Sequence, residues 1–165
     1  MKYTPFEKFE LQTKLSEQEI LNRLQQHTEP KKMFRNALFM SKDAKYFEGT
    51  FAANTFQLRR IIRYKNSFLP CITGTIEKDF QGYYVKIKME LHKVVKYFII
   101  VWLGFAAFIT ISLFPKLQES SAFLPIVPFL VIVAAYAISL GGFKYESNKA
   151  KKYLTQLLEA EETSS

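Results

Sequence analysis

Two apolar runs, residues 94–114 and 122–143, constrain this chain more than any other feature. Neither run contains a charged residue beyond Lys96, and each has about the 20 residues that a helix needs to cross a hydrocarbon core roughly 30 Å thick. The polar connector 115–121 is too short for a domain. The runs therefore predict a transmembrane helical hairpin with a tight turn. The alternative is a buried hairpin in a soluble core, which two uncharged runs of this length disfavour.

Lysines gather at the outer ends of the two runs. The connector holds only Lys116, and Glu119 offsets its charge. By the positive-inside rule, both termini are expected on the cytoplasmic side. The interiors of the runs lack ionisable residues, which argues against a transporter or a proton relay. The flanking lysines are Lys86, Lys88, Lys93 and Lys96 before the hairpin, and Lys144, Lys149, Lys151 and Lys152 after it.

The 165 residues leave room for one soluble domain beside the hairpin. Most of the net charge of +8 lies before residue 94, and a basic region next to a membrane suits anionic lipid head groups. Nucleic acid is the other partner that a basic region could bind. Attachment next to a membrane already explains why the net charge is positive, so nucleic acid is not the expected partner. We expect a cytoplasmic α+β domain at 1–93, the hairpin at 94–143, and a C-terminal amphipathic helix at 144–165 that packs on the domain.

Cys71 is the only cysteine, so an intrachain disulfide and a zinc site built from cysteine pairs are excluded. A single thiol fits a reducing cytoplasm. The first residues lack the apolar segment of a secretory signal, and Lys2 stands where myristoylation requires glycine. We expect the internal runs to direct membrane insertion.

The region before the hairpin predicts an antiparallel sheet and one helix. Ser16 and Glu19 form a capping-box pattern that begins a helix ending near residue 27. The stretch 31–45 is expected to be an irregular connection or a strand, with a short helix or an amphipathic segment lying on the membrane as the alternative. Strands are predicted at 6–13, 46–51, 56–64, 70–77 and 83–92, of which the last alternates most regularly.

After the second run, apolar residues recur at helical spacing over 150–158. This pattern predicts an amphipathic helix that packs on the sheet, and 161–165 is expected to be a frayed tail. The predicted fold class is α+β: a small antiparallel sheet with an N-terminal and a C-terminal helix, interrupted by the two-helix transmembrane hairpin.

The sequence contains no catalytic motif that we can recognise. His27 and His92 lack a second ligand at metal-binding spacing, and Cys71 follows a proline in a predicted strand, as a buried small side chain does. We expect no catalytic residue, no metal site and no cofactor, and the oligomeric state stays open.

Basic residues on neighbouring predicted strands form the candidate site. They are Arg59, Arg63, Lys65, Lys86 and Lys88. One interpretation is a surface for anionic lipids or an acidic protein partner; the other is a solvated sheet face. The predicted function is a membrane-anchored cytoplasmic binding or scaffolding module. The alternative is a ligand-binding subunit of a membrane enzyme, with a pocket between the sheet and the C-terminal helix.

A set of glycine, aromatic and proline positions carries a resemblance: Gly49, Phe56, Asn66, Ser67, Phe68, Pro70 and Gly74, followed by a strand and the hairpin. This arrangement resembles an uncharacterised family of small bacterial membrane proteins, which implies the bacterial inner membrane. The soluble part is similar to helix-grip or PH-like folds, in which a C-terminal helix closes a curved antiparallel sheet. This chain departs from those folds by placing a hairpin before that helix.

Overall fold

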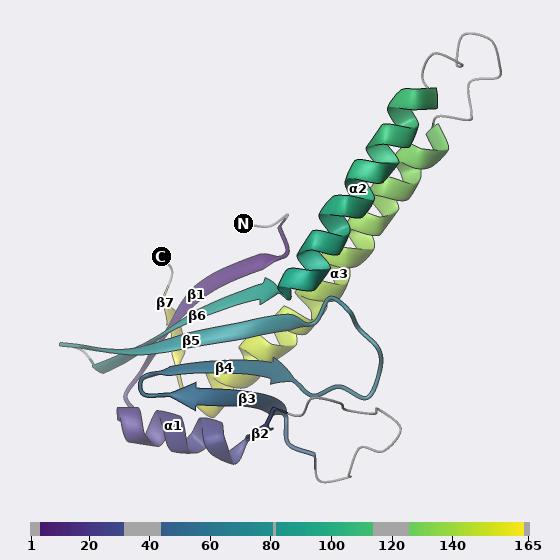
Figure 1. Ribbon diagram of the computed structural model, residues 1–165. Coiled ribbons are helices and arrows are strands. Elements are labelled where there is room, and N and C mark those ends of the chain that lie inside the picture. The colour runs from purple at the N-terminus through teal and green to yellow at the C-terminus, as the bar shows by residue number, and fades with distance from the viewer. Residues whose placement is uncertain (1–3, 32–43, 81, 114–125, 164–165) are drawn as a thin grey trace.

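The computed structural model describes residues 4–31, 44–80, 82–113 and 126–163. These residues form a mixed α+β structure with one seven-stranded sheet and three helices. Figure 1 shows α2 and the first part of α3 side by side, rising from one end of the sheet, while the rest of α3 runs behind the sheet. The strands are β1 (Phe6–Thr13), β2 (Thr28–Pro30), β3 (Phe47–Ala52), β4 (Thr55–Arg60), β5 (Pro70–Asp79), β6 (Gly82–Leu91) and β7 (Glu161–Thr163); the helices are α1 (Glu17–Gln26), α2 (Lys93–Leu113) and α3 (Ile126–Leu157).

The strands follow the order β2-β3-β4-β5-β6-β1-β7. Each neighbouring pair is antiparallel except β2 and β3, which are parallel. The sheet is therefore mixed at one edge, where a purely antiparallel sheet was expected. The expected frayed tail was also wrong, because Glu161–Thr163 pairs with β1 as the edge strand β7. The stretch 32–43 and the connector 115–121 lie outside the described residues.

Alternation in β6 places one row of side chains in the core. Val85, Ile87, Met89 and Leu91 are all buried. Phe56 of β4 joins this core and covers Gly74 of β5, where a Cβ would overlap the aromatic ring. The core therefore needs glycine at position 74, because any side chain there would displace the ring.

The capping box predicted at Ser16 is present at the start of α1. The Ser16 hydroxyl accepts the N–H of Glu19, and the Glu19 carboxylate accepts the N–H of Ser16 at 2.8 Å. Ile20 and Leu24 are buried on one face of this helix. Arg23 reaches the far end of α3, where it donates to the Leu157 carbonyl at 3.1 Å. The capped helix thus covers the sheet on the same side as α3.

Helix α3 is one continuous element of 32 residues. The sequence predicted a span ending at residue 143 and an amphipathic helix beginning at 150. The structure joins them, because the buried positions Phe143, Ser147, Ala150 and Leu154 keep helical spacing through the intervening turn. The same helix therefore leaves the apolar pair and closes the core of the sheet.

The two apolar helices are long and apolar enough to cross a membrane, as judged by length and composition. Their large apolar side chains point outward rather than into the fold: Phe98, Phe105, Phe108 and Ile111 on α2 are 63–72% exposed. We call α2 and the apolar part of α3 together the helix pair, and the end of the pair next to the sheet its base.

Candidate functional site

The structure divides the predicted basic set between two places. Arg59, Lys86 and Lys88 lie on the sheet face opposite α3, here called the open face, because their neighbours Leu58, Ile87 and the other alternate residues fill the core. Arg63 and Lys65 lie outside the sheet. They belong to the segment 61–69 between β4 and β5, because β4 ends at Arg60 rather than at residue 64 as predicted.

Carboxylates accompany the lysines of the open face. Lys86 pairs with Glu77 at 2.5 Å, and Lys88 lies 3.4 Å from Glu90. Glu90 also pairs with Lys96 at 2.6 Å, and this hydrogen bond holds the pKa of Glu90 below its usual range. Exposed pairs of this kind contribute little to stability, because solvent screens their attraction. Carboxylates therefore offset part of the positive charge in the central part of the open face.

The segment 61–69, here called the basal loop, lies beside the base of the helix pair (Figure 1). The Asn66 amide donates to the Gly142 carbonyl at 3.5 Å, and Phe68 packs so closely there that a Cβ at Gly142 would lie 3.2 Å from its ring. Arg63 and Lys65 are exposed. The loop thus presents two cations and a half-exposed Tyr64 at the level where the apolar helices begin.

A buried polar cluster fastens this loop to α3. The Glu146 side chain is fully buried and accepts hydrogen bonds from the guanidinium of Arg60 and the hydroxyl of Tyr64. Burial, together with the hydrogen bond to Glu146, raises the pKa of Tyr64 to about 12. The guanidinium of Arg60 also lies 4.7 Å from the ring centre of Tyr46. The sequence prediction missed this cluster, although Arg60 interrupts the alternation of its strand.

A second ion pair joins β1 to α3. Lys144 donates to Glu7 at 2.7 Å, and the buried hydroxyl of Ser147 donates to the other oxygen of the same carboxylate. Arg60 and Glu7 therefore hold the same turn of α3, residues 144–147, from two different strands. This arrangement fixes the direction in which α3 leaves the sheet.

Three described cavities open at the surface. One of about 450 Å³ lies at the end of β1 and the C-terminal residues, and one of about 390 Å³ is lined by His27, Tyr46 and Tyr153 at the edge of the sheet. There the Tyr153 hydroxyl and His27 Nδ1 are 2.7 Å apart, and the rings of Tyr46 and Tyr153 stack at 3.7 Å. The third, about 240 Å³, lies on the open face. Between sheet and α3, apolar side chains fill the space.

Metal-binding groups do not come together in the parts of the chain that the structure describes. No cluster of three or more His, Cys, Asp or Glu side chains there could hold a metal ion. His27 contacts Tyr153, and His92 accepts the N–H of Val94 at 3.3 Å. Both histidines thus have hydrogen-bonding partners within the fold.

We compared the chain with protein families, curated proteins and solved structures. None of them matches it, so any function must be argued from the geometry of this chain alone.

Proposed function

We propose that the protein is a membrane-anchored cytoplasmic binding or scaffolding module of the bacterial inner membrane. One observation carries this proposal: both apolar helices connect to the sheet without a linker. β6 ends at Leu91 and α2 begins at Lys93, while α3 continues from the apolar pair into the core. A hairpin in the bilayer would therefore hold the sheet directly at the membrane surface.

The distribution of charge supports cytoplasmic termini. Lys93 and Lys96 lie in the first turn of α2, and Lys144 lies where α3 meets the sheet. Lysines close to span ends stay preferentially on the cytoplasmic side during insertion. This orientation puts the whole sheet in the cytoplasm.

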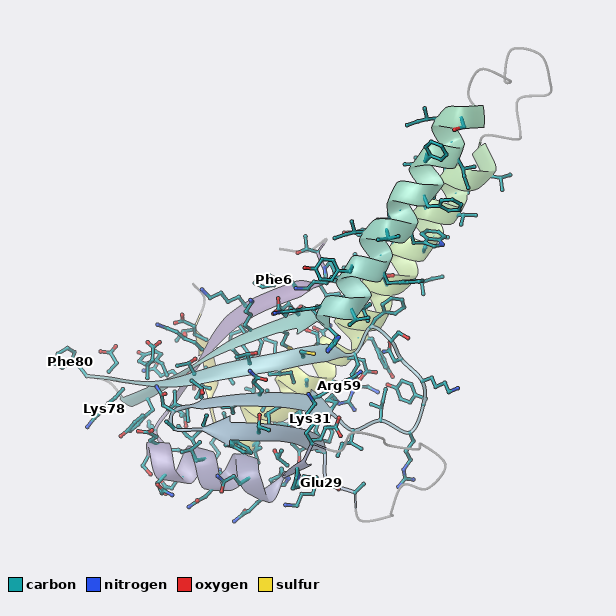
Figure 2. All side chains as sticks on the ribbon, in the orientation of Figure 1. Phe6, Glu29, Lys31, Arg59, Lys78 and Phe80 are labelled. Carbon is teal, nitrogen blue, oxygen red and sulfur yellow. The ribbon has the colours of Figure 1, made fainter. Side chains whose placement is uncertain are left out.

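The orientation can be tested by labelling cysteines in intact cells, in a Cys71→Ser background. Ser120→Cys in the connector should react with a membrane-impermeant maleimide. Phe80→Cys is the matched control, because Phe80 is fully exposed at the tip of the β5–β6 hairpin and should react only after permeabilisation (Figure 2). The reverse pattern, or protection of both sites, would refute the proposed topology.

The basal loop is the surface best placed to meet anionic head groups. Arg63 and Lys65 are exposed beside the base of the pair, and a cation near a negative membrane surface contributes about 1 kcal/mol. Lys86 and Lys88 have carboxylate partners instead. We therefore assign lipid contact first to Arg63 and Lys65. Arg59 lies apart from both groups, in the lining of the 240 Å³ cavity.

Hydrogen exchange in nanodiscs can test this assignment on the full chain. The amides of residues 61–69 should become more protected when phosphatidylglycerol replaces part of the phosphatidylcholine, and high salt should reverse the effect. Arg63→Gln with Lys65→Gln should remove the response. The control pair, Lys86→Gln with Lys88→Gln, removes the same amount of charge and should retain the protection response. Equal responses in both double variants would exclude the basal loop.

The alternative function, a ligand-binding subunit of a membrane enzyme, is favoured by the 390 Å³ cavity beside Tyr153 of α3. Its lining combines aromatic rings with His27 and Arg63, which suits a small polar ligand. The cavity opens at the edge of the sheet rather than between sheet and helix. A ligand that co-purifies with the wild-type protein but not with a Tyr153→Leu variant would favour this alternative.

A further inference from the structure

The 240 Å³ cavity hollows the open face at the end of the sheet nearest the helix pair. Its position follows from the strand register, in which Arg59 lies opposite Cys71 and Cys71 lies opposite Glu90. Figure 2 shows Arg59 and Lys31 together near this end, far from Phe80 at the opposite tip. Of the described residues that line the cavity, Lys31 and Arg59 are the basic ones and Glu48 is the carboxylate.

The guanidinium of Arg59, in the lining of this cavity, has a hydrogen-bond donor without an acceptor among the described residues. Its Nε is buried, and no described residue accepts a hydrogen bond from it. Buried polar groups in native proteins are nearly always partnered, so an exception of this kind points to a missing acceptor. A guanidinium presents its donors as a planar fork that matches the oxygens of a phosphate group.

Glu48, which lies opposite Arg59 in the strand register, is the one carboxylate among the described lining residues, and two other groups of the wall suit an anion. His92 Nδ1 accepts the N–H of Val94, so in the neutral ring the proton lies on Nε2, which is then a donor. Burial raises the pKa of the Cys71 thiol, so this side chain remains uncharged and does not repel an anion. Glu90 lies opposite Cys71 in the strand register, and its carboxylate already pairs with Lys88 and Lys96.

We propose that this cavity binds the phosphate group of one glycerophospholipid, with Arg59 and Lys31 as its cationic contacts. The proposal rests on the proposed placement of the helix pair in the membrane. His92 lines the cavity and directly precedes α2, so the site lies within one residue of the first span. Free phosphate has the same chemistry, but only the lipid is concentrated at this level.

Native mass spectrometry of the full chain in mild detergent can measure such binding. Titration with phosphatidylglycerol should give one saturable bound lipid, whereas diacylglycerol with the same chains, which lacks the phosphate, should not bind. Arg59→Gln should weaken the affinity about tenfold or more, because a hydrogen bond to a charged group is lost. Lys86→Gln removes one charge from the same face outside the cavity lining and should leave the affinity unchanged.

Several outcomes would overturn the site. Unchanged binding in Arg59→Gln, or equal weakening in Lys86→Gln, would remove the specific contact, and inorganic phosphate that competes as well as the lipid would assign the cavity to a soluble ligand. Lys31→Gln, at an exposed position, provides a second variant should Arg59→Gln fail to fold; it should also weaken binding. Lipid binding is measured in detergent and topology by labelling in cells, so the two results are independent. Absence of lipid binding would refute this site without refuting the proposed topology, and a wrong topology would be detected by labelling alone.

Discussion

The carboxylate of Glu146 in α3 and the guanidinium of Arg60 at the end of β4 form an ion pair inside the protein. The Glu146 side chain has no exposed surface, and that of Arg60 is 10% exposed. The two residues are 86 positions apart in the chain. Their contact therefore connects the sheet to the helix that leaves it.

Glu146→Gln should lower the free energy of unfolding by about 3–5 kcal/mol, because it leaves a buried cation without its partner. Chemical denaturation in detergent can measure the change. Glu77→Gln is the control, since it breaks only the exposed pair with Lys86 and should change the free energy of unfolding far less. The combined change Arg60→Leu with Glu146→Leu should recover part of the loss, whereas a larger loss in the double variant would contradict a simple ion pair.

Tyr64 makes stability depend on pH in the alkaline range. Its pKa is raised from 10 to about 12 in the fold, so the folded state holds the proton more tightly than the unfolded state. The contribution is fully present below pH 10 and is lost as the pH rises from 10 to about 12. A pH series of unfolding midpoints should show this decline, and Tyr64→Phe should reduce it. An identical decline in the variant would assign it to other groups.

Leu154→Asp should destabilise the sheet domain by several kcal/mol, because it places a charge without a partner in the core. The loss can be followed as faster proteolysis of the N-terminal domain. Gln156→Asp is the matched change at an exposed position of the same helix and should have little effect. Equal protease resistance in both variants would show that α3 does not stabilise the sheet.

Gly74→Ala should destabilise the protein by about 1–3 kcal/mol, because the new methyl group would overlap the ring of Phe56. Thermal unfolding should reveal a lower midpoint. Gly141→Ala provides the contrast, since a Cβ there meets nothing within 4 Å and alanine favours the helix. A neutral Gly74→Ala would mean that the Phe56 ring moves aside at little cost.

Sequence patterns predicted the local elements well. The strand at 6–13, the capped helix and the alternating strand before the hairpin depend on neighbouring residues, and β1, α1 and β6 lie where these patterns placed them. The parallel pairing of β2 was missed because three residues carry too short a pattern. The edge strand β7 was missed for the same reason.

The polar cluster could not be predicted because its members come from distant parts of the chain. Arg60 had one visible signal, a charge in a strand position that otherwise faces the core, but nothing in the sequence identified Glu146 as its partner. The basic set divided for a related reason. The strand ends at Arg60, which puts Arg63 and Lys65 beyond the alternation on which the prediction relied.

The uninterrupted course of α3 couples the orientation of the helix pair to that of the sheet. At about 1.5 Å per residue, 32 residues give a rod roughly 48 Å long. Its apolar part, residues 126–143, is close in length to the thickness of a hydrocarbon core, and a spanning helix changes its tilt with the local thickness of the bilayer. Because the same rod forms part of the core, any tilt of the helix pair must rotate the sheet by the same angle. With the helix pair placed across a membrane as proposed, the inclination of the sheet would then follow the local thickness of the bilayer.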